Sequence, residues 1–169
     1  MRKICMMFAL SLSLVFAACS DKNDDDFLIV DYAPVEFYIS LENSKGVDLL
    51  NAENEGAVDL DAITLYYDEK TYVLNPKSDP QATRLYMPHF EGMQLQKIDG
   101  KYRIYVGEFK GHPSYGGDDF TIEWGDGSLD CFSYTNKKVG RYDVDHNFFH
   151  NGQPVKSGDY PYVSITVIK

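Results

Sequence analysis

Hydrophobic and polar residues alternate along most of the chain after residue 31, which is the pattern of β-strands that bury one face. In 35–41 (VEFYISL), apolar side chains occupy every second position and polar or tyrosine side chains fall between them. The same period of two recurs in 120–124 (FTIEW), 129–134 (LDCFSY) and 162–168 (YVSITVI). Helical signals are few, since Asn51 can cap only a short turn before Gly56 ends it. The pattern therefore predicts an all-β domain.

Three pairs of strands are predicted to form hairpins. The stretch 63–74 has two β-rich runs that flank Asp68, Glu69 and Lys70, and Asn151 and Gly152 provide a turn further along. The most specific prediction is for 93–106 (MQLQKIDGKYRIYV), where Asp99 and Gly100 suit a two-residue type I′ turn. That turn sets four cross-strand pairs, with the apolar pairs on one face and the polar pairs on the other: Leu95 with Ile104, Met93 with Val106, Gln96 with Arg103, and Gln94 with Tyr105.

Short strands separated by turns favour an antiparallel β-sandwich, immunoglobulin-like in the broad sense, with a small barrel as the alternative.

The first 18 residues interrupt this pattern and have the features of a secretory signal. Arg2 and Lys3 precede an uncharged apolar run that is shorter than the ~20 residues of a membrane-spanning helix. The residues before Cys19, Phe16 to Ala18, resemble the lipobox of bacterial lipoproteins. The resemblance implies cleavage before Cys19 and acylation of that cysteine, and a plain signal peptide with an incidental cysteine is the alternative. Two or three acyl chains would make a stable anchor, whereas one would not.

These observations divide the chain into a signal peptide (1–18), a lipidated cysteine with an acidic tether (19–30) and one β-sandwich domain (31–169). The formal charge of the chain is −10, and loss of Arg2 and Lys3 lowers it to −12. Such a surface repels nucleic acid, so nucleic acid is not an expected partner. Cys131 is the one cysteine left in the domain, and its place in an alternating strand favours a buried, inert thiol.

An acidic, glycine-rich stretch at 118–130 (DDFTIEWGDGSLD) is the first candidate for a site. Its carboxylates could bind calcium, and the weak metal candidates are Asp118, Asp119, Glu123 and Asp126, with Asp130 nearby. The favoured interpretation is a tight turn, in which Gly125 and Gly127 take positive φ and Asp126 accepts hydrogen bonds from nearby amides.

Two family resemblances depend on this stretch. IEWGDG, 122–127, resembles the W-x-F-G-D-G motif of PKD-type immunoglobulin-like domains, which implies a sandwich. More of the chain resembles small lipoproteins of unknown function common in Bacteroidota, through the DLL at 48–50, the Y-x-x-K-T-Y at 67–72, the F-T-I-x-W-G-D-G run and the N-G-x-P-V at 151–155. In that group, acidic residues after the lipidated cysteine resemble an export signal to the outer face of the outer membrane. Here they are Asp21, Asp24, Asp25 and Asp26.

Other chemical motifs are incomplete. The DVDHN at 143–147 begins like an EF-hand loop but has Phe148 at the glycine position. His146 and His150 are four residues apart, as zinc pairs on helices are, yet they lie in a predicted strand. There is no G-x-S-x-G and no glycine-rich phosphate loop, so no enzyme activity and no cofactor are expected.

Tyrosines on the polar faces of the strands are the remaining candidates for binding. Tyr38, Tyr66 and Tyr105 fall opposite the apolar residues of their strands, where they could stack on sugars or contact a protein, although tyrosine is also common on half-exposed sheets. The sequence therefore favours a noncatalytic binding or accessory module for glycan or envelope protein, anchored in the outer membrane and facing outward. A purely structural envelope lipoprotein is the main alternative, and a calcium-binding module or an enzyme comes after it.

Overall fold

The computed structural model describes residues 32–75, 90–141, 143–156 and 162–169. The predicted signal peptide, Cys19 and the acidic tether lie outside these residues. Within them, ten strands form two sheets, one of four strands and one of six. None of the described residues belongs to a helix that is long and apolar enough to cross a membrane.

The four-stranded sheet has β1 and β5 at its centre. Its strand order is β10 (Tyr162–Ile168), β1 (Val35–Glu42), β5 (Lys101–Phe109) and β4 (Met93–Ile98). Strand β1 pairs antiparallel with β5 and parallel with β10, so the first and last described strands lie side by side.

The six-stranded sheet is antiparallel throughout. Its order is β3 (Lys70–Val73), β2 (Thr64–Tyr67), β6 (Gly117–Glu123), β7 (Leu129–Lys138), β8 (Val144–His150) and β9 (Gln153–Val155). Two short 3₁₀ helices lie between strands, η1 (Leu60–Ala62) and η2 (Pro113–Tyr115).

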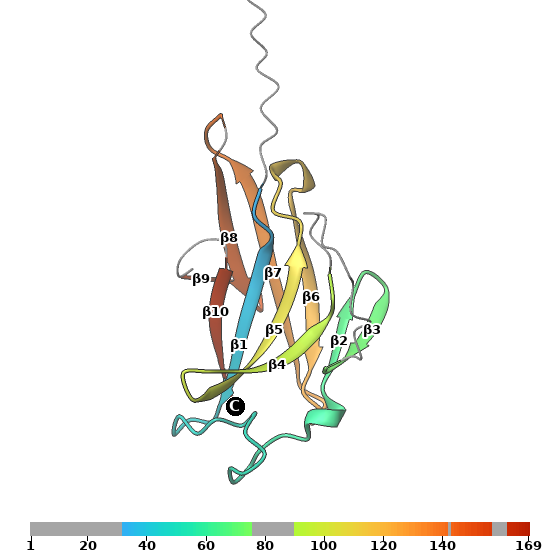
Figure 1. Ribbon diagram of the computed structural model, residues 1–169, viewed down its shortest axis with the longest axis vertical. Helices are drawn as coiled ribbons and strands as arrows, with labels where there is room; N and C mark the ends of the chain where they lie inside the picture. The colour runs from blue at the N-terminus through green and yellow to red at the C-terminus, as the bar shows by residue number, and fades with distance from the viewer. Residues whose placement is uncertain (1–31, 76–89, 142, 157–161) are drawn as a thin grey trace, which may run out of the picture. The chain divides into compact units, whose positions relative to one another are not determined.

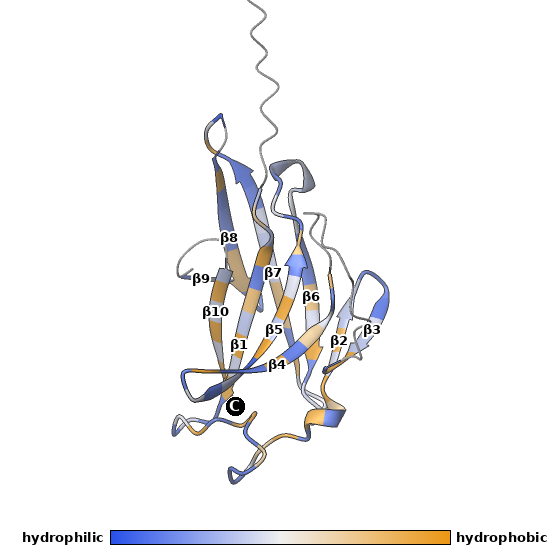
Figure 2. Ribbon diagram, in the orientation of Figure 1, coloured by the Kyte–Doolittle hydropathy of each residue, from blue (hydrophilic) through white to orange (hydrophobic). Residues whose placement is uncertain are grey.

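The two sheets pack face to face, with the four-stranded sheet in front of β6, β7 and β8 in Figure 1. The hydropathy of the residues alternates along β1 and β10, as the ribbon colours of Figure 2 show, and the apolar residues belong to a shared core. Phe37 of β1 lies at its centre, with its ring 5.0 Å from Phe120 of β6 and 5.4 Å from Phe148 of β8. Burial of one face of each sheet stabilises this arrangement. The two packed sheets confirm the predicted β-sandwich.

All three predicted hairpins are present. Strands β4 and β5 pair in the predicted register, including Leu95 with Ile104 and Gln96 with Arg103. Asp99 and Gly100 both have positive φ, as a type I′ turn requires. The β2–β3 hairpin turns at Asp68 and Glu69, and the β8–β9 hairpin at Asn151 and Gly152.

The stretch 51–56 forms turns without an α-helix. Asn51 Oδ1 accepts a hydrogen bond from the amide of Glu53, and Gly56 has a positive φ of 79°. This is the short capped turn that the sequence predicts.

Candidate functional site

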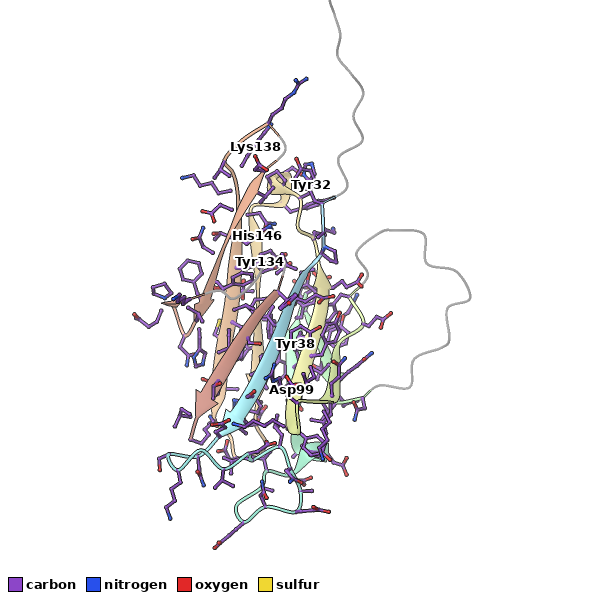
Figure 3. All side chains as sticks on the ribbon, turned by 60° about the vertical axis from the view of Figure 1, so that its left-hand side comes forward. Tyr32, Tyr38, Asp99, Tyr134, Lys138 and His146 are labelled. Carbon is purple, nitrogen blue, oxygen red and sulfur yellow. The ribbon has the colours of Figure 1, made fainter. Side chains whose placement is uncertain are left out.

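Two of the three tyrosines singled out from the sequence meet on the outer side of the four-stranded sheet. Tyr38 of β1, labelled in Figure 3, pairs across the strands with Tyr105 of β5, and their ring centroids are 5.4 Å apart. Tyr162 of β10 lies on the other side of Tyr38, at 5.8 Å. We name this surface, formed by Glu36, Tyr38, Tyr105 and Tyr162, the tyrosine face.

Glu36 lies among these rings and accepts hydrogen bonds from two of them. Tyr105 Oη donates to Glu36 Oε1 at 3.2 Å, and Tyr38 Oη donates to Glu36 Oε2 at 3.3 Å. Burial and the neighbouring Glu36 carboxylate raise the pKa of both phenols. Because both hydroxyls therefore keep their protons at physiological pH, the tyrosine face presents hydroxyl groups and a carboxylate rather than phenolates.

The close approach of Tyr105 to Glu36 depends on Gly107. A Cβ atom at this position would lie 3.0 Å from Tyr105 Oη and 3.4 Å from Glu36 Cγ. A side chain there would displace the phenol, so the glycine keeps the space in which the hydrogen bond forms. Sequence reasoning did not find this role, because nothing local to residues 105–107 shows that Glu36 lies beside them.

The rings of the tyrosine face are not coplanar. The planes of Tyr38 and Tyr105 meet at 54°, and those of Tyr38 and Tyr162 at 81°. Tyr162 is 41% exposed, while Tyr38 and Tyr105 are half-buried. The surface therefore offers aromatic groups at changing angles, which differs from a flat stacking platform.

Tyr66 lies on the other sheet. It is 42% exposed on β2, and its hydroxyl donates to Glu123 Oε2 at 2.7 Å. It thus resembles Tyr38 in having a carboxylate partner, but it has no part in the tyrosine face.

The four metal candidates do not share a site, and two of them bond to different tyrosines. Asp118 Oδ2 accepts a hydrogen bond from Tyr67, and Glu123 accepts one from Tyr66. Asp119 is exposed on β6. Among the residues that the structure describes, no three His, Cys, Asp or Glu side chains lie close enough together to hold a metal ion.

Asp126 makes the contact predicted for a tight turn. Its Oδ1 accepts a hydrogen bond from the amide of Ser128 at 2.8 Å and another from the Ser128 hydroxyl. Gly125 and Gly127 have φ values of 81° and 82°. The glycines and the carboxylate therefore act together to reverse the chain between β6 and β7.

A buried carboxylate, Asp130, is the most connected polar group of the domain that the structure describes. It is 5% exposed and accepts a hydrogen bond from Trp124 Nε1 at 2.6 Å and one from Asn151 Nδ2 at 2.7 Å. His150 Nε2 lies 2.7 Å from its Oδ1, and Lys169 Nζ lies 3.2 Å from its Oδ2. Burial by itself would raise the pKa of Asp130, but the bonds from His150, Asn151, Trp124 and Lys169 outweigh it and lower the pKa to about 2.

The two histidines of β8 have structural partners. His146 is buried, its Nδ1 lies 2.7 Å from Asn136 Oδ1, and burial lowers its pKa. His150 contacts Asp130 and stacks on Phe132. They are four residues apart in a strand, where the rise per residue is about 3.3 Å, so they are too distant to share a zinc ion.

A serine–histidine contact at 112–114 also serves the local backbone. His112 Nδ1 lies 2.7 Å from Ser114 Oγ and accepts a hydrogen bond from the Ser114 amide at 3.0 Å. The second of these contacts caps the N-terminus of η2. Because this nitrogen already accepts a backbone hydrogen bond, it is poorly placed to act as a general base for the serine.

The prediction of a buried Cys131 is wrong. Its thiol is exposed on β7, between the buried Asp130 and Phe132. The alternation was correctly identified, but the apolar character of cysteine suggested the wrong face, because Asp130 takes the inward position through its bonds to Trp124 and His150.

A comparison of the chain with protein-family models, curated proteins and solved structures finds no match.

Proposed function

We propose that this protein is a noncatalytic glycan-binding module, anchored in the outer membrane by lipid on Cys19 and facing the cell exterior. The observation that carries the proposal is the tyrosine face, where three strands bring Tyr38, Tyr105 and Tyr162 together beside one carboxylate. Aromatic rings contribute large contact areas at small entropic cost, and hydroxyl and carboxylate groups beside them can bond sugar hydroxyls.

The acidic tether supports the proposed location. Cys19 is followed within seven residues by Asp21, Asp24, Asp25 and Asp26. In the lipoproteins that the chain resembles, acidic residues after the lipidated cysteine resemble an export signal to the outer face of the outer membrane, where the tyrosine face would be accessible to polymers outside the cell.

A binding screen with matched tyrosine variants tests the proposal. The full chain in detergent is screened against soluble and insoluble glycans and against envelope proteins. We expect Tyr38→Ala and Tyr105→Ala each to weaken glycan binding by roughly two- to tenfold, since a specific aromatic contact contributes about 0.5–1.5 kcal/mol.

Tyr66→Ala is the matched control, because Tyr66 is bonded to a glutamate as Tyr38 and Tyr105 are, but lies exposed on the six-stranded sheet. It should leave binding unchanged. Capture of an envelope protein through the tyrosine face would replace the glycan with a protein ligand. Absence of any ligand, with all variants folded, would favour the structural alternative.

A further inference from the structure

The outer side of the four-stranded sheet continues beyond the tyrosines into a row of polar side chains. Arg103 lies two residues before Tyr105 on the same side of β5 and pairs with Gln96 of β4, while Gln94 pairs with Tyr105 itself. The planar amides and the guanidinium therefore border the tyrosine face along one side.

Arg103 differs from the other basic group on this surface in its contacts. Lys101 Nζ lies 2.6 Å from Glu42 Oε1, so its charge is paired. Arg103 Nε is buried and has no hydrogen-bond partner among the residues that the structure describes. An unsatisfied buried donor is unfavourable, and the guanidinium would gain hydrogen bonds by turning toward a ligand on the adjacent tyrosines.

Charges of both signs lie on this side of the sheet. Four acidic groups, Glu36, Glu42, Glu91 and Glu108, accompany Lys101 and Arg103, and Glu91 belongs here because its Oε2 accepts a hydrogen bond from Gln94 Nε2. A polyanion would be repelled by Glu36 and by the acidic remainder of the domain, and a polycation would be repelled by Arg103. A ligand without net charge avoids both repulsions.

Hydrogen-bonding capacity agrees with a neutral sugar. Glu36 offers only acceptors, Arg103 offers only donors, and Gln94 and Gln96 offer both. Sugar hydroxyls also donate and accept, so they can satisfy this mixture of groups without any ionic partner.

The angles between the rings restrict the physical form of the ligand. Planes that meet at 54° and 81° cannot all lie flat on the surface of a crystalline polysaccharide. They can contact successive sugars of a single chain whose rings rotate along its length.

We infer that the ligand of the tyrosine face is a neutral polysaccharide bound as a single soluble chain, with Arg103 and Glu36 setting its specificity. This inference rests on the proposed function, because it names the ligand class of the same surface.

Affinity electrophoresis of the full chain in detergent tests it. The probes are soluble neutral glucans, mannans and galactans, polygalacturonate as a polyanion, chitosan as a polycation, and microcrystalline cellulose in a pull-down as a flat surface. We expect retardation by at least one neutral polymer and weaker binding to the other three probes. Arg103→Gln should weaken neutral binding by about tenfold, because hydrogen bonds from a charged donor are lost.

Arg141→Gln is the matched control, since Arg141 is an exposed arginine in the segment between β7 and β8. It should bind as wild type does, and melting temperatures should show that both variants are folded. Tightest binding to polygalacturonate, chitosan or cellulose, or full binding by Arg103→Gln, would overturn the inference while leaving glycan binding intact. Failure of every glycan probe would overturn the proposed function as well.

Discussion

At the scale of single residues, Asp130 shows how a charged group is kept inside the sandwich. A buried carboxylate is unfavourable unless donors surround it, and here Trp124, Asn151, His150 and Lys169 do so from four positions in the sequence. These contacts join β7, β8 and the end of β10, so a single side chain connects both sheets.

Asp130→Asn tests this role. The amide must present an NH₂ group to donors, so we expect the free energy of unfolding at pH 7 to fall by about 1–3 kcal/mol. Urea unfolding of both proteins measures the change. Asp119→Asn, which alters an exposed carboxylate on β6, should change stability by less than about 0.5 kcal/mol.

The same pair of variants has a defined pH dependence. Because folding lowers the pKa of Asp130 from 3.8 to about 2, its ionised form stabilises the fold above pH 4, and this contribution is lost as the pH falls toward 2. After allowance for solvent screening, the contribution is about 1–2 kcal/mol. The stability difference between wild type and Asp130→Asn should therefore shrink between pH 4 and 2, and a constant difference would contradict the assignment.

At the scale of elements, turn geometry sets how the strands meet. Gly125 and Gly127 have almost the same positive φ, but their surroundings differ. A Cβ at Gly125 would lie 2.7 Å from Ala62 Cβ of η1, whereas a Cβ at Gly127 has nothing within 4 Å. The β6–β7 turn therefore packs closely against the chain before β2 at one glycine only.

Alanine at each glycine separates backbone strain from steric overlap. Gly127→Ala should destabilise the domain by about 1–2 kcal/mol through its left-handed conformation alone. Gly125→Ala should cost about 1 kcal/mol more, because Ala62 must shift. Thermal or urea unfolding measures both.

A second substitution checks the cause. Ala62→Gly removes the atom that the new methyl group meets, so it should recover part of the loss in Gly125→Ala and none in Gly127→Ala. Equal effects at the two glycines would show that Ala62 is irrelevant to the turn.

At the scale of the whole molecule, the β-sandwich explains how distant segments form one surface. The parallel pairing of β1 with β10 places Glu36 opposite Tyr162, and the antiparallel pairing with β5 places Tyr38 opposite Tyr105. The tyrosine face thus draws on both ends of the described chain. Cys19, the proposed site of lipid anchoring, lies outside the described residues.

Cys19→Ala tests the anchor. We expect the variant to remain unprocessed or to leave the outer-membrane fraction, since the thiol is the atom that would be acylated. Cell fractionation and metabolic labelling with a fatty acid measure this, with Cys131→Ala as the control that should fractionate like wild type. Continued acylation of Cys19→Ala would rule out this cysteine as the anchor.

Local patterns in the sequence determined the strands, the three hairpins and the register of one of these hairpins. The alternation in 93–106 and the Asp99–Gly100 turn were sufficient for the β4–β5 register, because side-chain period and turn type both depend on neighbouring residues. The same alternation placed Tyr38 and Tyr105 outward.

Tertiary structure alone decided which of these residues meet. The β1–β10 pairing joins residues more than a hundred positions apart, and such a pairing is set by packing of the shared core around Phe37 rather than by any local signal. For the same reason the sequence grouped Tyr66 with Tyr38 and missed Tyr162 and Gly107. It also assigned Cys131 to the interior. Two of the donors that let Asp130 take the inward position, Asn151 and Lys169, lie far from it in the sequence, and such contacts exist only once the strands have assembled.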